Sequence, residues 1–248
     1  MPPEFILIII GATFLIGLSK GGLGGPVPVS LTTPLLSLVM PVSQAVSLSL
    51  PLLILADVFA LWAYWGVWDA RYVRLMLPAG VIGVIMGVWL LASLPDDALR
   101  RILGTFTLIV IIYKFASDRL KSIEYQSRTW HGYLAGWAAG LASALANTGA
   151  PPFTAYMLLQ QVPPLTFIGT TTLFFAIINA LKLPGVIIAD QLDFNLLLSI
   201  LWVIPLIPVG VWVGRSIVKR FNPQAFENFM LVLLFCASLF LIFSTPPS

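Results

Sequence analysis

Ten apolar segments follow one another along the chain, separated by brief stretches that contain charged residues, proline or glycine. Runs such as 196–213 and 229–243 are apolar on every face of a helix, whereas the strands of a membrane barrel alternate apolar and polar residues. The pattern therefore predicts helices that lie in a bilayer. The ten segments fall at about 5–18, 26–40, 44–66, 72–94, 98–117, 130–146, 151–161, 165–189, 194–218 and 224–244.

Segment length divides these helices into two kinds, since a full crossing needs about 20 residues. Six segments are long enough, whereas the first, second, sixth and seventh are short. Each short segment is expected to be either a short helix or half of a re-entrant pair. Composition agrees with the membrane assignment, because 59% of the 248 residues are hydrophobic and 9% are charged, against about 25% charged in soluble domains. We therefore expect an all-α polytopic membrane protein.

The two halves of the chain repeat the same order of landmarks. This order predicts two five-segment halves with broken or re-entrant short helices: a first transmembrane repeat over residues 1–117, a cytoplasmic linker over 118–129 and a second repeat over 130–248. The matched landmarks are Gly24-Gly25-Pro26 with Gly149-Ala150-Pro151, Pro41 with Pro163, 47–49 with 170–172, Asp69 with Asp193, Pro78, Gly83 and Gly87 with Pro205, Gly210 and Gly214, and Pro95 with Pro223.

Basic residues predict how the two repeats face the membrane. Three connections rich in lysine and arginine fall on one side when each half has five segments, and the positive-inside rule makes that side cytoplasmic. Both termini are then outside, and an odd number of segments per half gives an inverted repeat, which many secondary transporters share. The residues that set this orientation are Arg71, Arg74, Lys114, Arg119, Lys121, Arg128, Arg215, Lys219 and Arg220.

A glycine-rich break at Gly17–Pro26 interrupts the first apolar region and holds five glycines and a lysine. Irregular backbone at membrane depth is tolerated only where protein buries it or where it lines a polar cavity. The helix that starts after Pro26 would direct unpaired N–H groups and its positive dipole end into the break, which is an arrangement suited to an anion. We therefore expect substrate-binding residues here, namely Ser19, Lys20, Gly21, Gly22, Gly24 and Gly25.

The second half carries a degenerate copy of this break at Asn147–Pro152. Asn147, Thr148 and Gly149 offer an amide, a hydroxyl and a flexible backbone before a second helix start. Two facing helix N-termini would form a pocket for a small oxyanion. By contrast, Gly83, Gly87, Gly210 and Gly214 are expected to permit close helix packing.

Charged and hydroxyl side chains inside apolar segments extend this list. Asp57 and Lys182 lie well inside long segments, where ionisable residues are functional candidates by default; they are expected to form an ion pair between the halves, or Asp57 carries a coupling proton. Lys20 is expected either to contact the anion, to neutralise an aspartate or to reach the cytoplasmic surface. Ser47, Thr170 and Thr171 are candidates for a polar lining, although any single hydroxyl commonly bonds back to its own helix.

Several classes of function find no support in the sequence. One histidine and one cysteine make a metal site of nitrogen and sulfur ligands improbable, and no phosphate-binding loop pattern is present. Nucleic-acid binding would need a basic face, whereas the 13 lysines and arginines are those that membrane orientation requires. We expect no enzymatic activity and no cofactor.

The motifs together resemble those of the sulfite exporter TauE/SafE family of permeases. The resemblance rests on Gly24-Gly25-Pro26, on 147–152, on Gly169-Thr170-Thr171 and on Asn179 with Lys182, and it covers nearly the whole chain. It implies movement of sulfite or organosulfur anions across a bacterial-type inner membrane, coupled to protons. Many members have a second glycine-rich break, whereas residues 144–150 here hold one glycine, which changes the pocket and leaves the substrate open.

The sequence therefore favours a secondary transporter of a small sulfur-containing anion, working by alternating access as one repeat moves against the other. Its expected partners are that anion, protons and the lipid bilayer, and a homo-oligomer is left open. The alternatives are a passive anion channel and a non-transporting membrane scaffold.

Overall fold

A computed structural model describes residues 2–21, 27–120, 128–160, 162–217 and 223–243. These residues form helices and connecting turns, with no strand among them. The elements are α1 (Pro3–Lys20), α2 (Val27–Leu36), α3 (Val42–Ala63), α4 (Ala70–Ser93), α5 (Asp96–Leu120), α6 (Thr129–Ala146), α7 (Ala150–Leu159), α8 (Pro164–Ile188), α9 (Phe194–Ser199), the 3₁₀ turn η1 (Leu201–Val203), α10 (Leu206–Ile217) and α11 (Pro223–Phe243).

The helices follow the predicted segments, but α1, expected to be short, has 18 residues. Among the described residues, α1, α3, α4 and α8 are long and apolar enough to cross a membrane. The all-α polytopic prediction is confirmed at this level. The ninth segment differs from the prediction, because α9, η1 and α10 replace one long helix. Pro205 explains the break: proline has no N–H to donate to the preceding turn and crowds it.

Two aspartates start helices in matching ways. The Asp69 carboxylate accepts a hydrogen bond from the Arg71 N–H at 2.8 Å before α4. The Asp193 carboxylate accepts one from the Leu196 N–H at 3.0 Å before α9. Each cap satisfies one backbone donor that a helix start leaves without a partner.

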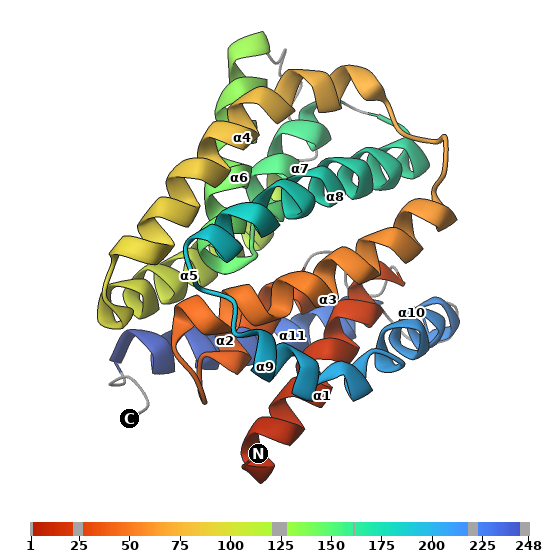
Figure 1. Ribbon diagram of the computed structural model, residues 1–248. Helices are drawn as coiled ribbons and strands as arrows, with labels where there is room; N and C mark the ends of the chain where they lie inside the picture. The colour runs from red at the N-terminus through yellow and green to blue at the C-terminus, as the bar shows by residue number, and fades with distance from the viewer. Residues whose placement is uncertain (1, 22–26, 121–127, 161, 218–222, 244–248) are drawn as a thin grey trace.

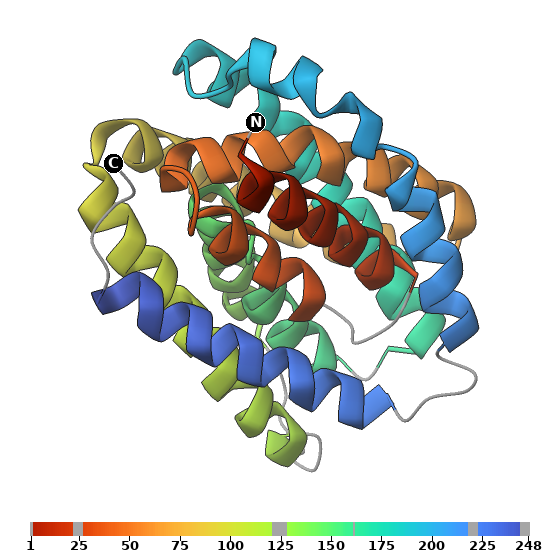
Figure 2. The ribbon, with the colours of Figure 1, turned by 90° about the horizontal axis from the view of Figure 1, so that it is seen from below.

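The helices gather into two groups with α3 between them (Figure 1). One group contains α4, α6, α7 and α8, and the other contains α1, α2, α9 and α10. Helix α11 lies along α2 and α5, as the view from below shows (Figure 2). Each group therefore combines helices from both halves of the chain.

Glycines bring these helices into close contact, as the sequence indicated. A Cβ added at Gly210 would lie 2.9 Å from the Gly17 Cα, and one at Gly83 would lie 2.2 Å from the Trp137 carbonyl oxygen. Such distances leave no room for a side chain, so α1 packs on α10, and α4 on α6, backbone against backbone.

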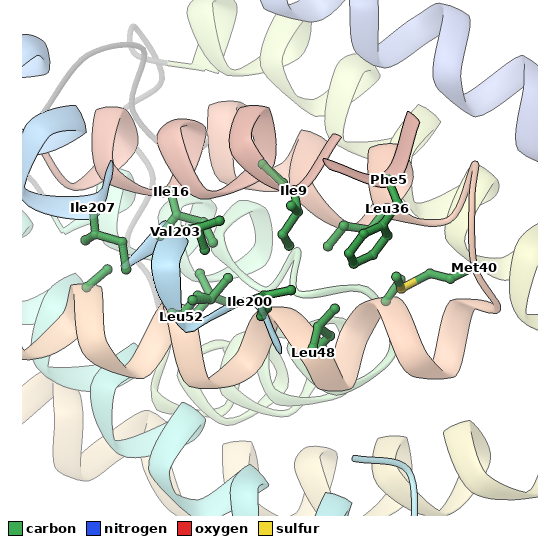
Figure 3. Packing of buried hydrophobic residues seen from close by; sticks show 14 residues of the cluster. Phe5, Ile9, Ile16, Leu36, Met40, Leu48, Leu52, Ile200, Val203 and Ile207 are labelled. Atoms are coloured by element: carbon green, nitrogen blue, oxygen red, sulfur yellow. The ribbon is translucent and has the colours of Figure 1, made fainter. Parts of the chain in front are cut away.

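A buried apolar cluster holds α1, α3 and the α9–α10 region together (Figure 3). Ile9 and Ile16 of α1 meet Leu48 and Leu52 of α3, and Ile207 of α10 closes the cluster from the second half of the chain. Dense packing of this kind fixes the position of Lys20 at the end of α1 and of Asp57 farther along α3.

Candidate functional site

A cavity of about 220 Å³ lies between α1, α2 and α3 on one side and α6, α7 and α8 on the other. Val29 in the first turn of α2 and Gly149 and Ala150 at the start of α7 reach its wall. The first turns of both short helices therefore reach the cavity wall. Its lining consists of Ser19, Lys20, Val29, Leu53, Ala60, Tyr64, Ser143, Asn147, Gly149, Ala150, Thr154, Phe167, Ile168, Thr171, Thr172, Phe175 and Asn179.

Asn147 ends α6 in a left-handed conformation, with φ of 54°. Asparagine adopts this conformation more readily than most residues. The Thr148 N–H then reaches back to the Ala142 carbonyl at 3.3 Å, and the Asn147 N–H bonds the Ser143 carbonyl at 3.0 Å, a pattern that closes helix ends. The turn aims the Asn147 side chain into the protein, where it is 6% exposed.

The Asn147 side chain connects the two halves of the chain. Its Nδ2 donates to the Ser49 Oγ at 2.8 Å and lies 3.2 Å from both the Thr33 Oγ1 and the Val46 carbonyl oxygen. Its Oδ1 accepts from the Nζ of Lys182 on α8. Every polar atom of the amide is therefore engaged, which fixes the side chain at the cavity wall.

Lys20, which lines the cavity, forms an ion pair with Asp57 of α3. The Lys20 side chain is 18% exposed and that of Asp57 is 3% exposed. The second carboxylate oxygen of Asp57 accepts from the Nδ2 of Asn179 at 2.7 Å. A lysine ammonium has three donors, so Lys20 can bind Asp57 and still present N–H groups to the cavity.

The predicted Asp57–Lys182 ion pair is replaced by another arrangement. Asp57 pairs with Lys20, and the Nζ of Lys182 donates to the Ser143 carbonyl at 2.8 Å as well as to Asn147. Among the residues that the structure describes, no carboxylate lies within 4 Å of Lys182, which is 0% exposed. The halves are joined through the two asparagines, because an amide can serve as donor and acceptor at once.

The other predicted residues fall into three sets. Ser19, Gly149 and Thr171 line the cavity with Lys20 and Asn147. Thr148 is buried beside it, and its hydroxyl has no hydrogen-bond partner in the described part of the chain. Gly22, Gly24 and Gly25 lie outside the described residues, and three further candidates, Gly21, Ser47 and Thr170, lie away from the cavity lining.

Those three candidates have structural contacts instead. Gly21 ends α1, and a Cβ there would lie 2.6 Å from the Val211 carbonyl oxygen of α10. The Ser47 hydroxyl bonds back to the Ser43 carbonyl at 2.7 Å. The Thr170 hydroxyl bonds the Thr166 carbonyl at 2.7 Å and accepts from the Asp69 N–H at 2.9 Å, which ties α8 to the turn before α4.

Sequence reasoning missed several residues of the site, namely Ser49, Ser143, Thr154, Thr172 and Asn179. Asn179 could have been found, since it follows Pro163 by the same sixteen residues that separate Asp57 from Pro41. Ser49 and Thr172 lie at the ends of the matched landmarks 47–49 and 170–172, whereas Ser143 and Thr154 carry no such signal. Within the described part of the chain, no group of three His, Cys, Asp or Glu side chains could hold a metal ion.

The arrangement can bind a small anion. An ammonium, two amide side chains, five serine or threonine side chains, one tyrosine and the first turns of two helices line a cavity that apolar side chains otherwise enclose. Donors to an oxyanion are strongest where water is excluded.

Comparison with known proteins agrees with this chemistry. The family model described as sulfite exporter TauE/SafE matches residues 7–241, nearly the whole chain. Searches of curated proteins and of solved structures find no significant match. The match includes every described element that builds the cavity, so the protein is a membrane permease of sulfite or related anions and belongs to the TauE/SafE family.

Proposed function

We propose that the protein is a secondary transporter that moves sulfite or a small organosulfur anion across a bacterial-type inner membrane, coupled to protons, by alternating access. The single observation that carries the proposal is the cavity between the two helix groups, with Lys20 and Asn147 on its wall. Lys20 offers a charged donor to an oxyanion, Asn147 orders the wall beside it through its own hydrogen bonds, and the α2 and α7 starts add their dipoles.

The inverted repeat is part of the proposal, with halves at 1–117 and 130–248, a cytoplasmic linker at 118–129 and both termini outside. Helix lengths support it, because α1 and α6 have 18 residues each, and α2 and α7 have 10 each. Asp57 and Asn179, sixteen residues beyond equivalent prolines, bond to each other at 2.7 Å. Equivalent positions that touch are expected at a two-fold axis.

The packing favours a particular division for alternating access. Helix α1 of the first half packs on α10 of the second, and α6 of the second half packs on α4 of the first. A movement of one whole repeat against the other would separate these glycine contacts. We therefore propose that the two spatial groups, α1–α2–α10 and α4–α6–α7–α8, move against each other around the cavity.

Reconstitution into liposomes tests the function. Radiolabelled sulfite and methanesulfonate are supplied outside, and uptake is followed with and without an imposed pH gradient. Accumulation above equilibrium that depends on the gradient is expected. Flux that never exceeds equilibrium would indicate a passive channel, and no flux of either anion above that of empty liposomes would favour a scaffold.

A further inference from the structure

Lys182 is a buried ionisable group that the anion site does not use directly. It is 0% exposed and separated from the cavity by Asn147 and Ser143, both of which line it. Its Nζ has two acceptors, the Ser143 carbonyl and the Asn147 amide oxygen. A neutral amine has two N–H donors and an ammonium has three, so the two acceptors satisfy the amine completely.

Asp57 has the opposite surroundings. One carboxylate oxygen accepts from the Lys20 ammonium and the other from the Asn179 amide. A protonated carboxyl would need an acceptor for its O–H, but both of these neighbours are donors. The ionised carboxylate fits both contacts, so Asp57 is a fixed counter-charge to Lys20 and a poor place for a coupling proton.

Lys20 of α1 and Asp57 of α3, which pair with each other, are the charged groups of the site itself. Asp57, on α3, is the charged group close enough to act on Lys182 electrostatically. On α4, Arg74 is about 21 Å and Arg71 about 26 Å along the helix from Val88, which packs beside Gly185 near Lys182. His131 is about 18 Å along α6 from Ser143.

Two further titratable residues bring no charge to Lys182. Tyr156 of α7 packs beside Gly132 near the start of α6, and Asp190 is exposed about two turns beyond Lys182. The described part of the chain therefore supplies Lys182 with no balancing carboxylate at contact distance.

We propose that Lys182 is the proton-binding group of the transport cycle, a neutral amine when the cavity is empty and an ammonium when the cavity holds a monovalent anion. This inference rests on the proposed function and names the residue that couples it to protons. Without the proton, the charges of Lys20, Asp57 and Lys182 sum to zero. With the proton they sum to one positive charge, which the anion balances.

The loaded and the empty site thus have the same net charge. Moving a neutral site between the two sides of a membrane avoids the free-energy cost of an unbalanced buried charge. The proton is taken up from water with the anion and released with it, so no bond other than N–H forms or breaks. One proton and one monovalent anion cross together, and the step is electroneutral.

Proton uptake on binding tests the inference directly. Methanesulfonate is the probe, because it is monovalent across the neutral pH range. It is added to purified, weakly buffered protein with a pH indicator. The parent protein is expected to take up about one proton per anion bound, and its affinity should fall by about tenfold per pH unit above the midpoint of the lysine titration.

Two substitutions separate the states of the amine. Lys182→Arg is always charged and keeps donors for Asn147 and Ser143, so it should bind the anion with no proton uptake and no pH dependence. Lys182→Gln is never charged and should bind at least about tenfold more weakly, also without uptake. Thr13→Val, a buried change on α1 about two turns before Lys20, should keep the parent's uptake.

The outcomes are distinguishable. If the parent binds and both Lys182 variants still take up a proton, the inference is wrong while the transporter proposal stands. If the parent binds and transports methanesulfonate without proton uptake, Lys182 is not a coupling group. Absence of both binding and flux of methanesulfonate and sulfite in the parent would overturn the proposed function and this inference with it.

Discussion

Lys20 at the end of α1 lines the cavity and forms a part-buried ion pair with Asp57 inside α3, and Asn179 of α8 donates to the other oxygen of the same carboxylate. The anion would therefore meet a lysine whose charge is already balanced. We therefore expect Asp57 to compete with the anion for Lys20.

Removing the competitor should strengthen anion binding. In Asp57→Asn, Lys20 keeps its ammonium without a counter-charge, so methanesulfonate should bind about tenfold more tightly than to the parent. Lys20→Met should bind at least about tenfold more weakly. Isothermal titration calorimetry on purified protein measures both, and weaker binding by Asp57→Asn would show that Asp57 positions Lys20 for the ligand and does not compete with it.

The same two variants should lower stability. Removing one partner of a buried pair leaves an unbalanced charge and costs about 2 to 4 kcal/mol of the free energy of unfolding. The double variant Lys20→Met with Asp57→Asn leaves no unbalanced charge and should recover part of that loss. Thermal unfolding of the parent, the single variants and the double variant gives the four stabilities of a double-mutant cycle. If the losses of the single variants add up to that of the double variant, Lys20 and Asp57 do not interact energetically.

Two serines on α3 offer a matched test of the Asn147 connection. Ser47 and Ser49 are both 0% exposed, and both bond back to the preceding turn. The Ser49 Oγ alone of the two accepts from the Asn147 amide, at 2.8 Å. Ser49→Ala should therefore cost about 1 to 2 kcal/mol of stability and reduce anion flux, because a buried donor loses its best acceptor.

The matched variant Ser47→Ala should change stability by less than about 0.5 kcal/mol, since its hydrogen bond stays within one helix. Thermal unfolding and methanesulfonate uptake would be measured side by side. Equal effects of the two substitutions would contradict the assignment of Asn147 as the connection between the chain halves.

The sequence predicted the positions of the helices better than the contacts of the site. Apolar runs, glycine and proline locate helices through local rules, and the first turns of both short helices reach the cavity wall. Asp57 and Lys182 were predicted to pair because they occupy similar places along two long segments. Which residues pair depends on the rotation of each helix about its axis, and spacing along the sequence does not give that rotation. Lys20, which the sequence offered as a partner for an aspartate, takes Asp57 instead.

The partners of serine and threonine side chains could not be predicted from the sequence either. Ser47 and Ser49 differ by two positions, which places them on different faces of α3. Only the folded neighbours decide that Ser49 meets Asn147 and that Ser47 meets its own helix. Thr170 and Thr171 separate in the same manner, the first toward Asp69 and the second toward the cavity.

Two glycines on α1 test the close contact between α1 and α10. A Cβ at Gly17 would lie 2.5 Å from the Ile207 carbonyl oxygen, whereas a Cβ at Gly11 would meet nothing within 4 Å. Gly17→Ala must push the backbones apart, so it should cost about 2 kcal/mol or more and lower the yield of folded protein. Gly11→Ala should be neutral or slightly stabilising, since alanine favours a helix.

Thermal unfolding in detergent compares the stability of the two alanine variants. Gly17→Ala disrupts the contact between α1 and Ile207 of α10, whereas Gly11→Ala leaves it unchanged. A Gly17→Ala protein as stable as Gly11→Ala would mean that α1 and α10 do not pack as tightly as described.

Cavity size predicts which anions pass. The cavity of about 220 Å³ is larger than an apolar cavity of about 150 Å³ that holds benzene, so it has room for an organic group beside the oxyanion. Ala60 of α3 lines it and is 5% exposed. Ala60→Leu adds three carbons to the wall, which should reduce benzenesulfonate uptake by about tenfold while sulfite uptake changes by less than about threefold.

The ratio of the two uptake rates in liposomes is the measurement, because a general loss of folded protein lowers both rates equally. The polar side of the cavity, with Lys20 and Asn147, is unchanged in this variant, so oxyanion binding should persist. An equal fall in the uptake of both anions would place Ala60 on the path of every substrate. Unchanged uptake of both anions would place the organic group elsewhere in the cavity.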